Sequence, residues 1–315
     1  MVVFVGPAQL VLTASVARRY YVDGLSKVEI AEEFHLSRFK VARLIDTARA
    51  SGLVRVEIRY PGAVDVELSS RLQEAYGLQH AIVLDVHDDH PEALRQHLGE
   101  AAAELLTEIV TRGDVLGLGW ARSVSAMASA LSQLPTVPVV QLTGALSRPD
   151  AGASSIEVVR QVAKISGGRA YCFYAPLIVG DAATAQALRR QAEVAQAFKQ
   201  LPSVSKAIVG VGLCQPGQST VYDAVGAREQ RELRRCGVFA DISGILVDVD
   251  GNPVVTELTS RMIGVSAAQL RPIPEVLAIA YGPVKAPAVR AALSAGLVNS
   301  LVTHAALADG LLAAR

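Results

Sequence analysis

One stretch of this 315-residue chain, residues 26–50, constrains the fold more than any other. Its sequence is SKVEIAEEFHLSRFKVARLIDTARA. Ser26 and Glu29 have the spacing of a capping box, in which each side chain accepts a hydrogen bond from the backbone amide of the other residue. Ser37 is a second candidate N-cap, and the apolar residues that follow it have helical spacing: Val41, Leu44, Ile45 and Ala48. Two short helices joined by a tight turn, the second of them basic, predict a helix-turn-helix; an ordinary helical hairpin is the alternative.

The basic side chains of this stretch predict a DNA-binding surface. The first residues of a recognition helix reach base edges in the major groove, while neighbouring cations and the helix N-terminus hold phosphates. The residues expected to face base edges are Arg38, Phe39, Lys40 and Arg43, and those expected to hold phosphates are Lys27, Ser37 and Arg49. Because one helix reads too few base pairs, we expect two heads to act together on an operator with dyad symmetry.

The charge of the chain is distributed unevenly. The whole chain has a formal net charge of zero, but residues 1–60 have a net charge of +3 and the remainder has −3. A mildly basic head on a mildly acidic body is what a nucleic-acid-binding head joined to a ligand-binding body would show.

The chain divides into a small head and a larger body. Residues 9–22 have helical spacing and would back the two helices, while residues 54–60 alternate in polarity, which predicts a half-buried strand. Pro61-Gly62 ends that strand and marks a boundary. An amphipathic helix over residues 64–77 either packs on its own domain or pairs with a second copy of the chain. We therefore expect a DNA-binding domain over residues 1–60, a linker helix over 61–77 and an effector domain over 78–315.

From residue 80 onward, apolar strands alternate with amphipathic helices. The expected strands are residues 81–86, 115–119, 137–142, 169–174, 206–212, 276–282 and 300–304, and the helices include 92–111, 122–134, 154–165, 181–199 and 284–295. This alternation predicts an α/β domain with a mainly parallel sheet. Residues 245–258 instead form two alternating runs around Asp250-Gly251, which predicts an inserted antiparallel hairpin.

Two strand-to-helix turns could bind an anion. Ligands of open parallel sheets bind at the carboxyl ends of the strands. The first candidate turn comprises Gly117, Gly119, Trp120, Arg122 and Ser123. Its glycines allow a ligand to approach the backbone, and its arginine stands in a first helical turn, where the macrodipole disfavours a cation unless an anion is bound.

The second candidate turn contains Lys285, again at the start of a helix. A lysine there can simply be solvated, but two cations in equivalent turns favour an anion site. Asp241 lies in a later turn and could accept hydrogen bonds from sugar hydroxyls, the alternative being a solvated carboxylate.

Other kinds of site have weaker support in the sequence. The chain lacks G-x-S-x-G, Walker, H-E-x-x-H and C-x-x-C motifs. His87, His90 and His97 lie near three aspartates, but their spacing favours a solvated turn over a metal site. The three cysteines are widely spaced, which indicates reduced thiols in the cytoplasm. No apolar run is long enough to span a membrane. We therefore expect no cofactor, no metal and no membrane partner.

Taken together, several stretches resemble the SorC family of sugar-responsive bacterial transcriptional regulators. In the head, the resemblance lies in VARRYYVDGLSKVEIAEEFHLSRFKVARLIDTARASGLVRVEI. In the body, it lies in GDVLGLGWARSVSAMA, VVQLTGAL, APLIV, KAIVGVG, FADISG with VDVDG, and AIAYGPVKAPAVRAAL followed by LVTH. The similarity follows the order of the family over nearly the whole chain.

The resemblance implies a winged-type helix-turn-helix domain followed by an effector domain similar in fold to sugar-phosphate isomerases and deaminases. It implies a homodimer or homotetramer that binds operator DNA near a sugar-catabolism operon and responds to a sugar, a polyol or a sugar phosphate. The family's phosphate-loop positions would fall on Gly117, Gly119, Arg122 and Ser123, its acidic sugar contact on Asp241, and its late lysine on Lys285.

The chain departs from the family pattern at a few positions. His35 stands where the turn usually has glycine, and histidine tolerates a positive φ better than most residues. Ala121 and Ser123 stand where the family often has Gly and Thr, and His304 replaces a frequent acidic residue. Two alternatives to a regulator are a sugar-phosphate isomerase or deaminase with an appended head, for which no general acid–base pair emerges, and a dimeric scaffold that binds an acidic protein.

Overall fold

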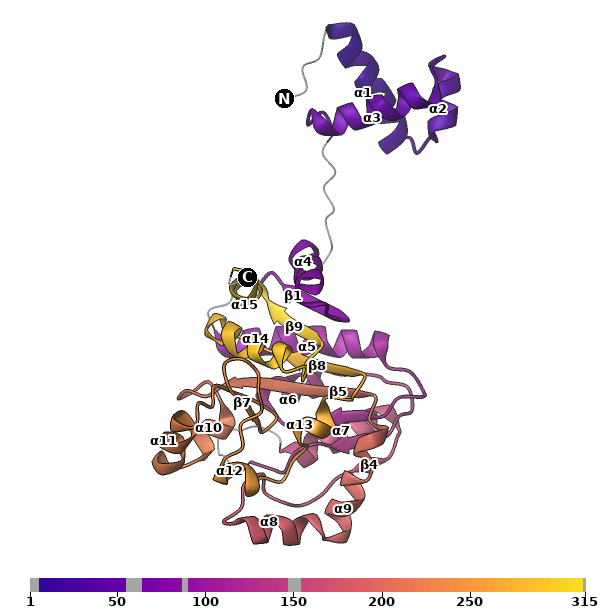
Figure 1. Cartoon of the computed structure of the whole chain (residues 1–315). Coiled ribbons are helices and arrows are strands. Elements are labelled where there is room, and N and C mark those ends of the chain that lie inside the picture. The colour runs from indigo at the N-terminus through magenta and orange to yellow at the C-terminus, as the bar shows by residue number, and fades with distance from the viewer. Residues whose placement is uncertain (1–5, 55–63, 87–89, 147–153, 314–315) are drawn as a thin grey trace. The chain divides into compact units, whose positions relative to one another are not determined.

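The computed structural model describes residues 6–54, 64–86, 90–146 and 154–313. The chain forms two compact units, Met1–Pro61 and Gly62–Arg315 (Figure 1). Each unit has its own hydrophobic core and is described by itself below.

The described part of the first unit contains three helices: α1 (Pro7–Tyr21), α2 (Lys27–Glu33) and α3 (Arg38–Ala50). The predicted capping box is present, because the Glu29 amide donates to Ser26 Oγ and the Ser26 amide donates to Glu29 Oε2. The Lys40 amide donates to Ser37 Oγ, so the second predicted N-cap is confirmed.

Helices α2 and α3 are joined by a tight turn and share one core. His35 in this turn has a φ of 51°, the left-handed conformation expected from the sequence. The core residues of the unit are Val16, Ile30, Val41, Leu44 and Ile45. The α2–α3 pair is therefore a helix-turn-helix backed by α1. The predicted strand over residues 54–60, which would form a wing, lies outside the described residues except for Val54.

The second unit is built on a sheet that has nine strands within the described residues. Seven parallel strands follow the order β1-β9-β8-β5-β2-β3-β4. They are β1 (His80–Leu84), β2 (Leu116–Leu118), β3 (Val139–Gln141), β4 (Ala170–Tyr171), β5 (Lys206–Leu213), β8 (Glu275–Ile279) and β9 (Ser300–His304). The strands β6 (Ala240–Ile242) and β7 (Ile245–Val247) form an antiparallel pair. Strand β6 also pairs antiparallel with the last residues of β5.

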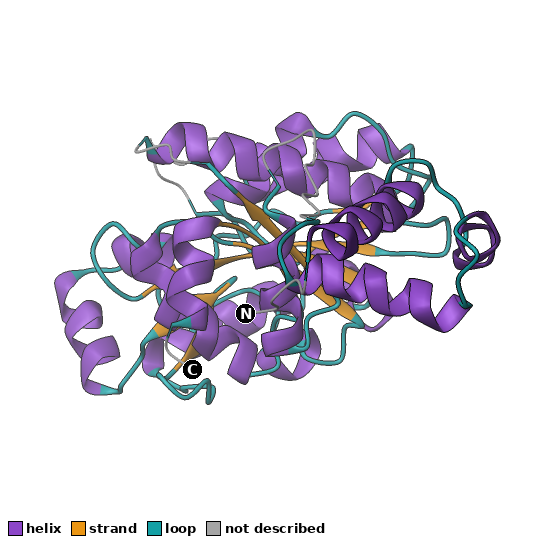
Figure 2. Ribbon diagram, turned by 90° about the horizontal axis from the view of Figure 1, so that it is seen from above, coloured by secondary structure: helices purple, strands orange, loops and turns teal. Residues whose placement is uncertain are grey.

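Helices cover both faces of this sheet (Figure 2). One face packs against α5 (Pro91–Ile109), α6 (Arg122–Ala130) and α7 (Ser155–Ser166), and the other against α4 (Val66–Tyr76), α14 (Ala286–Ser294) and α15 (Ala305–Leu312). Strand residues alternate between the two cores: Val276 and Ala278 of β8 belong to one, Leu277 and Ile279 to the other.

The remaining helices are short. They are α8 (Ala182–Arg189), α9 (Ala192–Phe198), η1 (Leu201–Ser203), α10 (Thr220–Ala224), α11 (Ala227–Arg235), α12 (Glu257–Ser260), α13 (Ala267–Leu270) and η2 (Pro283–Lys285). None of the described helices combines the length and the apolar character needed to cross a membrane.

The helix α4 packs on its own unit, which is one of the two arrangements that the sequence left open. Leu68 and Leu72 are buried in the core beside β1, and Tyr76 Oη donates to the carbonyl of Leu311 in α15 at 2.7 Å. The helix begins after Asp65, whose carboxylate accepts from the Leu68 amide. Val64, assigned to this helix from the sequence, instead forms an isolated bridge with Leu84.

Two expected elements differ in the structure. The predicted hairpin around Asp250-Gly251 is wrong as a strand pair: β7 pairs with the preceding strand β6, and only the bridge between Val247 and Pro253 forms across the later turn. This bridge is formed by the Asp248 amide, which donates to the Asn252 carbonyl, and the Val254 amide, which donates to the Leu246 carbonyl. The helix expected over residues 181–199 is divided into α8 and α9.

Candidate DNA-binding surface and effector pocket

The start of α3 presents an exposed, basic surface. Arg38, Lys40 and Arg43 are exposed, and the side chain of Phe39 is 79% exposed although it is a large apolar residue. These three cations form no ion pair with any residue that the structure describes. An unpaired basic surface with one exposed aromatic ring suits base edges, thymine methyl groups and phosphates.

The residues expected to hold phosphates lie around this surface. The Lys27 ammonium lies 5.8 Å from the ring centre of Tyr20, and the Arg49 guanidinium lies 5.4 Å from that of Tyr21. Contact with an aromatic ring leaves both cations able to attract a phosphate. Ser37 Oγ accepts from the Lys40 amide and caps α3, so this hydroxyl holds the helix N-terminus in place.

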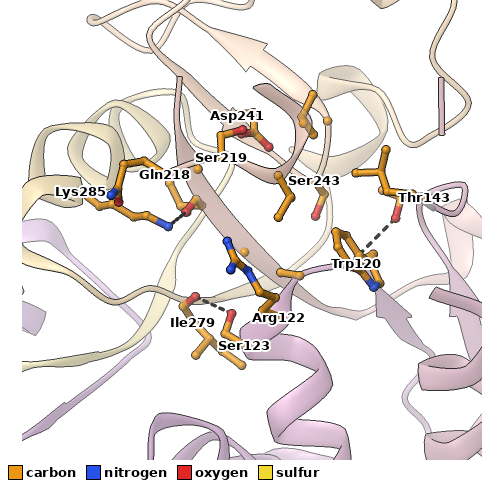
Figure 3. Close-up of a pocket in the computed structure, with 18 of the residues that line it drawn as sticks. Trp120, Arg122, Ser123, Thr143, Gln218, Ser219, Asp241, Ser243, Ile279 and Lys285 are labelled. Atoms are coloured by element: carbon orange, nitrogen blue, oxygen red, sulfur yellow. Dashed lines mark hydrogen bonds between the residues drawn. The ribbon is translucent and has the colours of Figure 1, made fainter. Parts of the chain in front are cut away.

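The second unit has a pocket at the carboxyl ends of β2, β5 and β8 (Figure 3). Its empty volume, including the open mouth, is about 610 Å³. In the sheet, β5 lies on the side of β2 opposite to β3, so the pocket stands where the strand order reverses. Open α/β sheets bind ligands at this kind of position. Five predicted site residues line this one pocket: Trp120, Arg122, Ser123, Asp241 and Lys285.

Arg122 is the first residue of α6, and its side chain points into the pocket (Figure 3). The N-cap of α6, Ala121, has no side chain that could accept from the first-turn amides. The pocket therefore faces the positive end of a helix and a guanidinium together. No carboxylate among the described residues forms an ion pair with Arg122. This arrangement attracts an anionic group.

Lys285 lies at the end of η2 and directly precedes α14. Its ammonium donates weakly to the Val211 carbonyl at 3.4 Å and lies 5.2 Å from the ring centre of Tyr281. Burial lowers the pKa of Lys285; Asp241 opposes this shift, whereas the positive charge of Arg122 adds to it. A bound anion would relieve the repulsion between the two cations.

Asp241 is buried in the wall of the pocket, with only 6% of its surface exposed. Burial raises the pKa of this carboxyl, while the Ser219 hydroxyl, Lys285 and the Gly244 amide oppose that shift. Ser219 Oγ donates to Asp241 Oδ2 at 2.5 Å. A Cβ at position 212 would come within 2.2 Å of Asp241 Oδ2, so Gly212 makes room for this pair.

Two of the predicted site residues do not line the pocket. Gly117 lies within β2, where a Cβ would meet Leu142 Cδ2 at 2.9 Å, and a Cβ at Gly119 would meet Ser243 Oγ at 2.1 Å. Both glycines therefore allow close packing behind the pocket. Ser123 lines the pocket, but its hydroxyl donates to the Ile279 carbonyl at 3.0 Å and so fixes α6 to β8.

The polar residues of the pocket that are absent from the sequence-based set include Thr143, Gln218, Ser219 and Ser243. Thr143 Oγ1 accepts from the Trp120 amide at 3.1 Å. Thr143 follows β3 and Ser219 follows β5. Both would have been predicted if the rule that ligands bind at the carboxyl ends of parallel strands had been applied to every strand. Ser243 has no such signal beyond its place two residues after Asp241.

The histidine and aspartate cluster near residue 90 does not form a metal site in the described residues. No group of three or more His, Cys, Asp or Glu side chains with the geometry to hold a metal ion occurs among them. His90 precedes α5 and His97 is exposed on it. His87, Asp88 and Asp89 lie outside the described residues.

His304, at the end of β9, supports the turn that carries Lys285. Its Nε2 accepts a hydrogen bond from the Gly282 amide at 3.0 Å, which requires the neutral ring. Burial lowers the pKa of His304. Because the unfolded chain binds a proton at this side chain below about pH 6.5 and the folded chain does so only at lower pH, the pair stabilises the fold less as the pH falls.

We therefore expect His304→Gln to reduce the loss of stability between pH 7.5 and 5.5, since an amide oxygen can accept from Gly282 without titrating. The slope difference is limited to about 1.4 kcal/mol per pH unit, the value for one proton. Urea unfolding followed by fluorescence of the single tryptophan, Trp120, measures it in this unit. The exposed His97→Gln variant serves as the control, and equal slopes for His304→Gln and the parent would refute this role.

Comparisons with known proteins agree with this architecture. The family model described as "Putative sugar-binding domain" matches residues 61–313. Transcriptional regulator LsrR of Klebsiella pneumoniae is 32% identical over 311 residues, which cover 96% of this chain and 93% of that protein. Transcriptional regulator YjhU of Escherichia coli is 29% identical over 305 residues, covering 93% and 92% of the two chains. The crystal structure of the full-length sorbitol operon regulator SorC from Klebsiella pneumoniae has a TM-score of 0.74 at 22% identity and covers 98% of this chain and 100% of that one.

A helix-turn-helix unit followed by a sugar-binding α/β domain defines a ligand-responsive transcriptional regulator. The chain belongs to the SorC family of sugar-responsive, DNA-binding transcriptional regulators. The predicted family and the predicted fold class are thus confirmed. The relatives are regulators by name, so the enzyme alternative is not favoured.

Proposed function

We propose that this chain controls transcription of a carbohydrate or polyol catabolic operon and responds to a phosphorylated sugar or polyol. The observation that carries the proposal is the pair Arg122 and Lys285, two cations without carboxylate ion pairs among the described residues, beside the buried Asp241. The cations suit a phosphate, and the carboxylate suits a sugar hydroxyl. The effector domain would comprise residues 78–315, with α4 as the linker helix.

The DNA-binding part of the proposal is supported by the exposed surface of α3. Arg38, Phe39, Lys40 and Arg43 would face the bases, and Lys27, Ser37 and Arg49 the phosphates. One such helix reads only a few base pairs, so two heads must engage a dyad-symmetric operator. A homodimer or homotetramer in the cytoplasm meets this need. Effector binding would change operator affinity by a coupling of about 1–3 kcal/mol.

Arg38→Ala tests operator reading. An arginine that hydrogen-bonds a base should contribute about 1–3 kcal/mol on the specific operator and much less on random DNA. The operator is first selected from a randomised duplex pool with purified protein, and affinities are then measured by fluorescence anisotropy. We expect Arg38→Ala to lose affinity for the selected sequence and to relax the base preference at one position of each half-site.

Two matched arginine variants complete this experiment. Arg49→Ala should weaken binding to all sequences alike and reduce the salt dependence, as loss of a phosphate contact does. Arg231→Ala, on the exposed face of α11 in the other unit, should change neither. Equal losses for Arg38→Ala on specific and random DNA would show that Arg38 does not read bases.

A further inference from the structure

Ser243 is held in a strained backbone conformation at the wall of the effector pocket. It is the first of the two residues that join β6 to β7, and both have positive φ: 50° for Ser243 and 86° for Gly244. Turns of this kind favour Asn, Asp or Gly at the first position. Serine is not among the residues enriched at positive φ, whereas His35, the other described non-glycine residue there, is.

The hydroxyl of Ser243 is also unsatisfied. The residue is 6% exposed, and its Oγ has no hydrogen-bond partner among the described residues. A buried hydroxyl without a partner costs free energy, as does the left-handed backbone. Glycine at this position would remove both costs. A residue that is doubly unfavourable for folding and lies at a binding pocket indicates a role in binding.

Ser243 lies beside other polar residues that line the pocket. Figure 3 shows Ser243 between Asp241, on the same hairpin, and Thr143. A Cβ at position 119 would stand 2.1 Å from Ser243 Oγ, so Gly119 preserves the space that this hydroxyl occupies. Rotation about the Cα–Cβ bond gives Oγ a choice of three staggered positions.

We infer that Ser243 is a specificity-determining residue whose hydroxyl hydrogen-bonds a hydroxyl of the effector, next to a hydroxyl held by Asp241. This inference rests on the proposed function of the pocket. It defines the effector class more narrowly: an anionic group at Arg122 and Lys285, joined to at least two neighbouring hydroxyls at Asp241 and Ser243. A simple anion would engage the two cations but not the hairpin.

The test compares Ser243→Gly with Ser243→Ala in the full-length chain. Glycine relieves the strain and removes the hydroxyl, whereas alanine removes only the hydroxyl. The probes are inorganic phosphate, ribose 5-phosphate, ribitol 5-phosphate and glucitol 6-phosphate, measured by calorimetry. We expect at least one polyhydroxylated phosphate to bind the parent about 10-fold tighter than inorganic phosphate, and both variants to lose about 5- to 20-fold for that probe only. Ser243→Gly should also melt at a higher temperature without a probe.

If Ser243 had a purely structural role, Ser243→Gly would not combine a higher stability with a weaker affinity for the preferred probe. The inference is overturned if no polyhydroxylated probe binds better than inorganic phosphate, or if Ser243→Gly binds the preferred probe as tightly as the parent does. The proposed anion site fails separately, if Arg122→Ala leaves the affinity for inorganic phosphate unchanged. The two failures are thus distinguished by the probe that each variant affects.

Discussion

Replacing Lys285 or Arg122 by alanine is expected to weaken binding of a phosphorylated effector by about 10- to 100-fold and to spare operator binding in the absence of effector. Hydrogen bonds to charged groups contribute roughly 1.5–3 kcal/mol each, and every 1.4 kcal/mol corresponds to a tenfold change in affinity. Both cations lie in the pocket of the second unit, whereas the operator-reading surface belongs to the first. Trp120 lines the same pocket, so its fluorescence and calorimetry can both report binding.

Three further variants sharpen this prediction. Arg122→Lys keeps the charge but loses the planar fork, so an intermediate loss is expected. Lys285→Gln leaves the buried Asp241 without its nearby cation and should behave like Lys285→Ala. Lys199→Ala, an exposed lysine at the end of α9, should have no effect. Unchanged affinity of both alanine variants for every phosphorylated probe would exclude an anion site built from two cations.

Local signals in the sequence predicted much of this fold because they act within a few residues. The capping box of Ser26 and Glu29 and the cap at Ser37 each depend on contacts only three residues apart. The apolar run that begins at Val276 coincides with β8 because a strand buried on both faces leaves no polar alternation. The left-handed residue in the turn between α2 and α3 is His35, at the position where the family pattern usually has glycine.

Two elements, the β6–β7 turn and the division between α8 and α9, depend on tertiary contacts and were not predicted from the sequence. The β6–β7 turn is formed by Ser243 and Gly244, a weaker turn signal than the Asp250-Gly251 pair a few residues later. The helix expected over residues 181–199 stops where Arg189 donates to the carbonyls of Met262 and Gly264. These contacts join segments more than 70 residues apart, so no local pattern encodes them.

The residues of the effector pocket were predictable where they directly follow the carboxyl ends of parallel strands. Arg122 and Lys285 stand at the carboxyl ends of β2 and β8, and parallel strands bring such turns together at one edge of the sheet. Ser219 lines the pocket, where it caps α10 and donates to Asp241. Ser219 and Asp241 are 22 residues apart, so the sequence spacing does not reveal this contact. Gly119 has a role in packing against Ser243, which only the fold can show.

The opposite edge of the sheet, at the amino ends of the strands, contains a buried ionic network. Glu275, only 3% exposed, accepts from Lys206 Nζ at 2.8 Å and Ser300 Oγ at 2.8 Å, and its Oε1 lies 2.6 Å from His80 Nδ1. These residues come from the amino ends of β8, β5, β9 and β1, so one carboxylate joins four adjacent strands. Burial alone would raise the pKa of Glu275, but the hydrogen bonds from Lys206, His80 and Ser300 outweigh it and hold the pKa below its usual value.

Glu275→Ala is therefore expected to destabilise the second unit by about 3–5 kcal/mol, because it leaves Lys206 partly buried without its counter-ion. Urea unfolding followed by Trp120 fluorescence measures this loss in that unit. Glu92→Ala is the matched control: Glu92 is 90% exposed and pairs with Arg95 at 3.4 Å, so its removal should cost about 0–1 kcal/mol. Similar losses for the two variants would contradict the importance of the network.

The pH dependence of the same network provides a second, independent measurement. A carboxyl whose pKa is lowered by folding stabilises the native state above its unfolded pKa of about 4.3, and this contribution is lost as the pH falls through the folded pKa. Glu275→Gln is nearly isosteric but has no charge, so it should be less stable than the parent at pH 7. The difference should shrink as the pH falls below about 4, where the parent's carboxyl also becomes neutral. A difference that stays constant from pH 7 to pH 3 would mean that packing around Glu275, and not its charge, holds the four strands together.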